Sequence, residues 1–221
     1  PPTRVTPTPT LRLRLRLPLP PVPTVRATVP RAGLSAEIVV REAALVVDES
    51  GVDALTLAVV AERLGVRTPS LYKHVDGMPA LQRGIMLAAK TDLVATLGRA
   101  AVGKAGGDAI RAIAIAYRRW AIAHPGWYPT TVRAPVPGDE EDLAVSEAFT
   151  TLVFAVLGGY ELRGDDAIDA TRFLRSALHG FVALETGHAF ELPVDIDRSY
   201  ARLVDSVVTA LSTWSASGGK R

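Results

Sequence analysis

Residues 64–77, which read LGVRTPSLYKHVDG, decide the fold that this sequence is expected to adopt. Gly65 marks a turn, and Thr68 is of a residue type that caps a helix at its N-terminus. Pro69 then falls at the first helical position, where its missing N–H group costs nothing. The Tyr-Lys-His sequence that follows is unusual for a short helix in a protein core. We therefore expect this helix to present a binding surface.

Two further short helices are predicted directly before this segment. Apolar residues recur at helical spacing between Ser35, which is expected to cap the first helix, and Gly51, which ends it. Thr56 is expected to cap the second helix, which ends at Gly65. Three short helices, with the last two joined by the turn at residues 65–67, match a helix-turn-helix.

The third helix has one side suited to packing and one suited to nucleic acid. At about 100° per residue, Leu71 and Val75 are expected to pack on the first two helices. The other side carries hydroxyl, ammonium, phenol and imidazole groups, which suit base edges and phosphate oxygens. Taken alone, Tyr72 would be a tyrosine whose hydroxyl has a hydrogen-bond partner, and His74 would be an ordinary surface histidine. Their combination with the glycine turn, the cap and the proline favours DNA binding.

Helical periodicity continues through the rest of the chain, and no convincing strand is predicted. The later helices are expected at about residues 79–101, 108–124, 140–157, 165–185 and 197–215. The sequence therefore predicts an all-α fold. The expected divisions are a disordered basic arm over 1–33, a helix-turn-helix domain over 34–80, a helical domain over 81–216 and a tail over 217–221.

The positive charge of the chain is concentrated in the arm. The formal net charge is +2, but residues 1–33 hold six arginines and no acid, which leaves 19 basic and 23 acidic residues from Leu34 onward. Any attraction to nucleic acid must therefore come from a local patch. The alternating LRLRLRL sequence in the arm would suit a strand, but the prolines on both sides favour a disordered tail.

Composition argues against several classes of protein. The chain has no cysteine, which excludes disulfides and thiolate metal sites and favours a cytoplasmic location. We find no run of the roughly 18 uncharged apolar residues that a membrane span needs. The four histidines are scattered, and no serine lies in the context of a nucleophile elbow. We therefore expect no metal site, no cofactor and no catalytic residue.

Residues 54–81, ALTLAVVAERLGVRTPSLYKHVDGMPAL, resemble the DNA-binding domain of the tetracycline-repressor (TetR) family of transcriptional regulators. The matching features are Leu-Thr before the second helix, Ala-x-x-Leu-Gly-Val into the turn, and Ser-Leu-Tyr-x-His-Val in the third helix. Residues 177–185, ALHGFVALE, resemble a C-terminal core that contains a His-Gly motif in one subgroup. That subgroup often has a tryptophan where this chain has Arg175.

The resemblance implies a role for each matching position of the helix-turn-helix. Ser70 and Lys73 would reach bases, Tyr72 and His74 would favour phosphates, and Thr56 would contact the DNA backbone. Met78 stands where family members commonly have a phosphate-binding lysine, so binding is expected to depend on Arg67, Lys73 and main-chain N–H groups. The expected DNA-binding residues are Thr56, Arg67, Thr68, Pro69, Ser70, Tyr72, Lys73 and His74.

The resemblance also implies a ligand cavity and a homodimer in the C-terminal domain. Any one aromatic residue there is more simply explained as core, but together they supply candidates for the cavity. The candidates are Tyr117, Trp120, His124, Trp127, Phe149, Phe173 and His179. The last two helices would form a four-helix dimer interface. On the last helix the expected seam is Tyr200, Val204, Val207, Leu211 and Trp214.

The function predicted from this resemblance is a ligand-responsive transcriptional regulator, with repression favoured. As a dimer it would bind a pseudo-palindromic, double-stranded DNA operator, and a small-molecule effector would release it. The alternative from another class is a carrier or enzyme that uses the aromatic cavity of the C-terminal domain.

Overall fold

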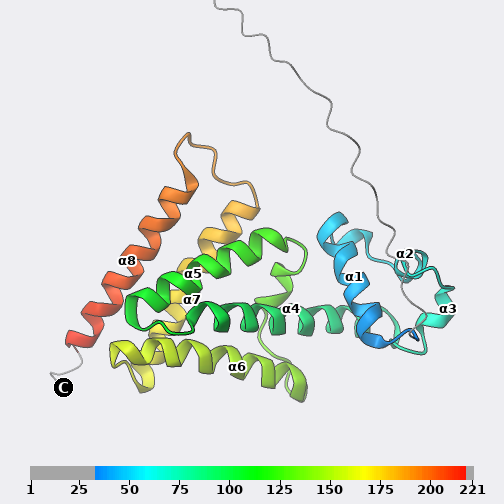
Figure 1. Ribbon diagram of the computed structural model, residues 1–221, viewed down its shortest axis with the longest axis horizontal. Helices are drawn as coiled ribbons and strands as arrows, with labels where there is room; N and C mark the ends of the chain where they lie inside the picture. The colour runs from blue at the N-terminus through cyan, green and yellow to red at the C-terminus, as the bar shows by residue number, and fades with distance from the viewer. Residues whose placement is uncertain (1–32, 218–221) are drawn as a thin grey trace, which may run out of the picture. The chain divides into compact units, whose positions relative to one another are not determined.

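A computed structural model describes residues 33–217, and every regular element in that range is helical (Figure 1). The expected all-α fold is therefore confirmed. The arm and the tail lie almost wholly outside the described residues. The helices are α1 (Ala36–Ser50), α2 (Leu57–Arg63), α3 (Thr68–Leu71), α4 (Gly77–Ala101), α5 (Gly106–Ala123), α6 (Glu140–Leu157), α7 (Gly164–Thr186) and α8 (Ile196–Ser217). Short 3-10 turns are η1 (Val52–Ala54), η2 (Tyr128–Thr131) and η3 (Gly158–Tyr160).

The first two helix caps are confirmed. The Ser35 hydroxyl accepts a hydrogen bond from the Ile38 N–H at 3.3 Å, and the Thr56 hydroxyl accepts one from the Val59 N–H at 3.1 Å. Each bond satisfies an N–H group that has no partner within the helix. The chain therefore begins both helices where the hydroxyl residues predicted.

The expected cap of α3 is wrong by one residue. Thr68 is the first helical residue, while Arg67, with extended backbone, stands at the N-cap and makes no capping bond through its side chain. The helix is also shorter than the predicted segment, because regular α-helix stops at Leu71. A turn then continues to Val75, closed by the His74 and Val75 N–H groups donating to the Leu71 carbonyl.

The helix-turn-helix domain has its own apolar core, as the sequence periodicity predicted. Val39 of α1, Val60 of α2 and Leu71 of α3 are all fully buried. On the outside, Arg63 of α2 donates to Glu42 and Glu49 of α1, with 2.5 Å for both pairs. Helix α3 thus packs on the core of the helix-turn-helix domain through the side that carries Leu71.

Helix α4 belongs to both halves of the described chain. Near its start, Leu81 and Ile85 pack into the core of the helix-turn-helix domain. Farther along, Ala89, Leu93 and Leu97 pack into the core formed with α5 and α6. Helix α4 therefore contributes side chains to both cores and connects them.

Helix α8 packs inwards along the seam that was expected to face a second chain. Tyr200, Val204, Val207 and Leu211 are buried in the core of their own chain, against α5 and α7. Trp214 lies against Phe173 of α7, with ring centroids 5.5 Å apart. These side chains are therefore occupied within their own chain, and the seam expected to face a second chain is not available to it.

Helix α6 is unusual because its apolar side chains are incompletely covered. With η3 it forms the one segment of the described chain, Glu140–Tyr160, that is long and apolar enough by composition to cross a membrane. It nevertheless packs on α4, α5 and α7, and Val153, Val156 and Leu157 are buried. Several of its remaining apolar side chains line the cavity described below.

Candidate functional site

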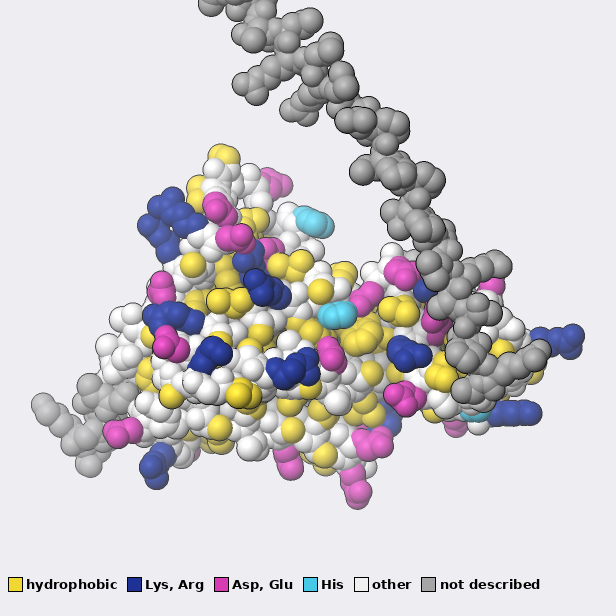
Figure 2. Space-filling model, in the orientation of Figure 1, with side chains coloured by type: hydrophobic (Ala, Val, Ile, Leu, Met, Phe, Trp, Pro, Cys, Tyr) yellow, Lys and Arg dark blue, Asp and Glu magenta, His cyan; other side chains and the backbone are white. Residues whose placement is uncertain are grey.

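The surface around α3 exposes the residues expected to contact DNA. Tyr72 is 59% exposed, and Arg67 and Lys73 are also exposed. Of the other candidates, Thr56 and Pro69 are exposed, and Thr68, Ser70 and His74 are partly buried. Figure 2 shows basic side chains protruding from the end of the described chain where α2 and α3 lie. All eight predicted residues are therefore at least partly exposed.

The cations of this surface are not neutralised by the protein. Within residues 33–217, neither Arg67 nor Lys73 forms an ion pair, whereas Arg63 nearby is held by two carboxylates. An exposed cation without a partner is free to bind a phosphate oxygen or a base edge. The side chain of Met78, in contrast to those of Arg67 and Lys73, packs against the core of the helix-turn-helix domain.

A cavity of about 550 Å³ lies between α4, α6 and the segment that follows η2. This volume falls within the range of about 300–1,000 Å³ that is usual for small-molecule sites. Its walls combine apolar and charged side chains. They are Lys90, Leu93, Val94, Tyr117, Thr131, Val132, Arg133, Ala134, Pro135, Leu143, Val145, Ser146, Glu147, Phe149, Thr150, Thr151, Phe154 and Arg175.

A buried ion pair joins α4 to α6 beside the cavity. The Lys90 ammonium donates to Asp142 at 2.5 Å and to the Ser146 hydroxyl at 3.3 Å, and the Asp142 side chain is fully buried. Burying a charge away from water is costly unless an opposite charge compensates it, so each member of this pair stabilises the other. The pair therefore fixes the start of α6 relative to α4.

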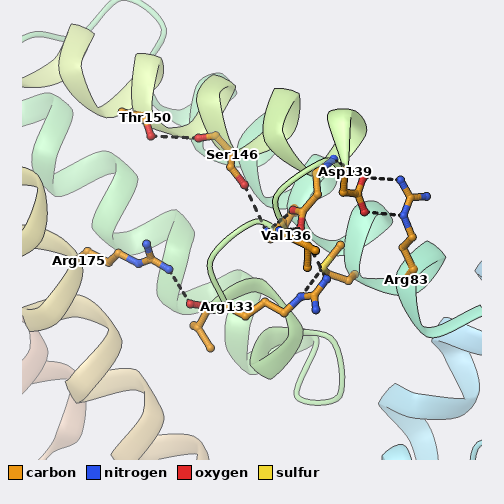
Figure 3. A network of polar contacts seen from close by, with 11 residues as sticks. Arg83, Arg133, Val136, Asp139, Ser146, Thr150 and Arg175 are labelled. Carbon is orange, nitrogen blue, oxygen red and sulfur yellow. Dashed lines mark hydrogen bonds and ion pairs between the residues drawn. The ribbon is translucent and has the colours of Figure 1, made fainter. Parts of the chain in front are cut away.

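A second link between α4 and α6 is more exposed. The Arg83 guanidinium forms two parallel bonds with Asp139, at 2.7 and 2.6 Å (Figure 3). It forms a third bond with Glu141. Hydrogen bonding from Arg83 holds the pKa of Asp139 down, to about 2. Farther along the same helix, Met86 accepts a bond from Arg133 at 3.0 Å. The segment that closes the cavity, residues 132–139 after η2, is thus attached to α4 at several points.

Two of the seven expected ligand residues, Tyr117 and Phe149, line the cavity. Tyr117 donates to the Tyr128 hydroxyl at 3.1 Å, and that hydroxyl lies 2.5 Å from Nδ1 of His179. Burial, and after it the charge of Arg175, lowers the pKa of His179. His179 therefore connects with the cavity through two tyrosines rather than by lining it.

Trp120, His124 and Trp127 are brought together elsewhere, at the junction of α1 with the end of α5. The His124 ring stacks on Trp127, with centroids 4.8 Å apart, and Trp120 lies against both. The Trp127 indole donates to the Ala44 carbonyl of α1 at 2.8 Å. None of the three lines the cavity, and Phe173 instead packs on α8.

The polar residues of the cavity were missed at the level of the sequence. Lys90 stands among apolar α4 positions such as Ala89 and Leu93, and a charge in such a place is a signal for a buried partner. Arg175 gave another signal, since it stands where the subgroup that the sequence resembles often has a tryptophan. Their partners, Asp142 and the Val132 carbonyl, are 52 and 43 residues away in sequence, so the periodicity of one helix could not identify them.

Comparisons with known proteins agree on one group. Residues 110–207 match the family model described as tetracyclin repressor-like, C-terminal domain. An HTH-type transcriptional regulator of Mycobacterium tuberculosis is 35% identical over 88% of this chain and 89% of its own length. An HTH-type transcriptional regulator of Bacillus subtilis is 33% identical over 82% of this chain and 95% of its own length.

Two solved structures share the fold. A protein of unknown function from Rhodococcus sp. RHA1 superposes with a TM-score of 0.71 at 21% identity, covering 83% of this chain and 99% of that one. The TetR family protein ActR of Streptomyces coelicolor, in complex with (S)-DNPA, has a TM-score of 0.61 at 16% identity and covers 83% of this chain and 100% of that one.

Proposed function

The chain belongs to the tetracycline-repressor family of HTH-type transcriptional regulators, and on this premise we propose that it is a ligand-responsive repressor. As a dimer it binds a pseudo-palindromic DNA operator in the cytoplasm, and a small molecule in the cavity releases it. The observation that carries this proposal is the exposed surface of α3, where Arg67 and Lys73 have no carboxylate partner within the described residues.

The contacts with DNA divide into two kinds. Ser70 and Lys73 reach base edges, which supply specificity, while Tyr72 and His74 bind phosphates, which position the helix. Thr56, at the start of α2, contacts the DNA backbone, and Arg67, in the turn before α3, adds to the attraction. The surface is small and the body is mildly acidic, so one protomer alone binds weakly. Two copies on successive major grooves, about 34 Å apart, supply the rest.

The proposed dimer uses the outer faces of α7 and α8. On α7 the exposed face includes Ile168, which is 40% exposed, and Leu184, which is 50% exposed. Between them lie Ser176 and Gly180, also exposed, whose small size allows a second helix to approach closely. Apolar side chains at both ends of a stripe of small residues are typical of a helix–helix interface.

Ligand binding is coupled to DNA binding through α4. The first turns of α4 pack within the helix-turn-helix domain. Arg83 attaches this helix to Asp139, at the end of the segment that closes the cavity, and Lys90 attaches it to Asp142 of α6. A ligand that moves this segment therefore shifts α4 and the spacing of the two recognition helices. Coupling of this kind usually amounts to about 1–3 kcal/mol. The complex of ActR with (S)-DNPA supports a ligand-binding role for this fold.

A gel-shift assay with the DNA that flanks the chain's own gene tests the proposal. Lys73→Ala is expected to weaken binding by about 1–3 kcal/mol and to reduce the salt dependence by the equivalent of about one phosphate contact. Lys104→Ala is the matched control, because Lys104 is exposed beyond the end of α4 and should leave binding unchanged. Absence of salt-sensitive binding to any such DNA would contradict the proposed function.

A further inference from the structure

The charged groups of the cavity differ in how far the protein neutralises them. The Lys90 ammonium already has partners, because Asp142 and Ser146 accept hydrogen bonds from it. Arg133 is partly engaged: its Nε donates to the Met86 sulfur at 3.0 Å, and an Nη lies 3.6 Å from Asp142. Lys90 therefore has little capacity for a ligand, and Arg133 retains some.

Arg175 of α7 is the cation with the most free capacity. One Nη donates to the Val132 carbonyl at 2.9 Å, on the segment that closes the cavity (Figure 3). No carboxylate of the described residues pairs with it. A guanidinium has five N–H donors, so most of those of Arg175 remain available. Its charge also acts on nearby groups, since together with burial it lowers the pKa of His179.

Three of the five hydroxyl groups that line the cavity are already used as donors, and a fourth, that of Ser146, accepts from Lys90. Thr131 donates to the Tyr128 carbonyl at 2.8 Å, Thr150 to the Ser146 carbonyl at 3.0 Å, and Tyr117 to the Tyr128 hydroxyl. A neutral polar ligand would find few free donors among them. The guanidinium N–H groups are the strong donors that remain, and these favour a carboxylate or a similar anion.

Most of the remaining wall is apolar. Leu143 and Phe154 of α6 are 36% and 39% exposed, although both are large hydrophobic side chains, and both line the cavity with Phe149. Covering such surface contributes about 25 cal/mol per Å². Glu147 is the one carboxylate among the lining residues. Even with Asp142 added, the cations at the cavity outnumber the carboxylates.

We propose that the cavity binds an amphipathic anion, a medium-chain or aromatic carboxylate, whose charged group is held by the free N–H groups of Arg175. The apolar part of the ligand lies against Phe149, Phe154 and Leu143. This names the chemical class of the effector and so rests on the proposed function. Because Arg175 also holds Val132, a carboxylate at this position acts directly on the segment attached to α4.

Isothermal titration with decanoate, 1-decanol and decylamine at pH 7.5 tests this. These probes share one alkyl chain and differ in charge. Decanoate is expected to bind at least about tenfold more tightly than decanol, because hydrogen bonds to a charged group are stronger than those to a neutral one. Decylamine is expected to bind most weakly. Arg175→Gln is expected to abolish the preference for decanoate while decanol binding stays the same. Arg172→Gln is the matched control, because Arg172 lies on α7, is exposed and pairs with Asp169.

Several results would overturn the inference. Equal affinity for the three probes, tighter binding of decylamine, no binding of any probe, or a decanoate preference that survives in a folded Arg175→Gln protein would each do so. Operator binding is measured on the same samples without ligand. If DNA binding is intact and the preference is absent, only the ligand class fails; if the preference is present and DNA binding is absent, the regulator proposal fails.

Discussion

The carboxylate of Asp48, in the last turn of α1, binds the imidazole of His124 at the end of α5, with Oδ2 2.8 Å from Nδ1. The other oxygen accepts from the main-chain N–H groups of Gly126 at 2.9 Å and Trp127 at 3.2 Å. One side chain thus ties the helix-turn-helix domain to the larger helical body. This contact is independent of α4, so the two parts of the described chain are joined at two places.

Removing this link is expected to destabilise the protein. In Asp48→Ala the N–H groups of Gly126 and Trp127 lose their acceptor, which costs about 1–3 kcal/mol of the free energy of unfolding. Urea denaturation followed by circular dichroism measures the change. The control is Asp53→Ala, since Asp53 is exposed in η1 and should have little effect. Equal stabilities of the two variants would show that the contact does not hold the domains together.

The approach of α1 to the loop after α5 depends on the absence of a side chain at residue 126. A Cβ on Gly126 would lie 2.3 Å from the Val47 carbonyl oxygen, and that oxygen belongs to the backbone of α1 and cannot easily move. We expect Gly126→Ala to lower the free energy of unfolding by about 1–3 kcal/mol, as overpacking does. Gly98→Ala on α4, where nothing lies within 4 Å, should be neutral or slightly stabilising. A neutral Gly126→Ala would contradict the predicted clash.

The Lys90–Asp142 pair provides a test based on charge. Asp142→Ala leaves the Lys90 ammonium buried without its counterion, so a loss of about 3–5 kcal/mol is expected. The double variant Lys90→Met/Asp142→Leu replaces both charges with apolar groups and should recover most of that loss. Thermal unfolding of the two proteins compares them directly. A double variant no more stable than the single one would argue against an uncompensated charge as the cause.

The stability of the protein should depend on pH through His179. Burial, followed by the charge of Arg175, lowers its folded pKa below the ordinary value of 6.5, so the unfolded chain binds the proton more readily. This contribution to stability is present above about pH 6.5 and is lost as the pH falls toward the lower folded pKa. The melting temperature should therefore drop between pH 7.5 and 5.5 by more in the wild type than in His179→Gln. A drop of the same size in both proteins would exclude His179 as its source.

The proposed dimer face can be tested at Gly180. No heavy atom of residues 33–217 lies within 4 Å of a Cβ at this position, so Gly180→Gln should fold as well as the wild type. If a second α7 packs against this face, the added side chain blocks it, and analytical ultracentrifugation should detect monomers. Gly98→Gln, at an equally open helical position on α4, should leave the dimer intact. If Gly180→Gln forms a dimer with the affinity of the wild type, the dimer interface does not include this face of α7.

Local features of the sequence predicted most of the fold. The Ser35 and Thr56 caps, the Gly65 turn and the periodicity of the longer helices depend on residues within one or two turns of each other. The α3 cap was misplaced by one residue because the backbone changes from extended to helical between Arg67 and Thr68, and residue type alone does not specify that position. The surface of α3 was also predictable, since it faces solvent and depends on a single short segment.

The sequence by itself determined that the chain is helical, where most helices begin, and which side of the α3 segment packs into the core. The tertiary structure alone decided that the Tyr200–Leu211 seam is buried in its own chain, that Trp120, His124 and Trp127 form a domain junction, and that Arg175 lines a cavity. The physical reason is that helix formation depends on neighbours within a few residues. Burial and ion pairing instead depend on partners about 50 to 80 residues away, such as Asp142 for Lys90 and Asp48 for His124.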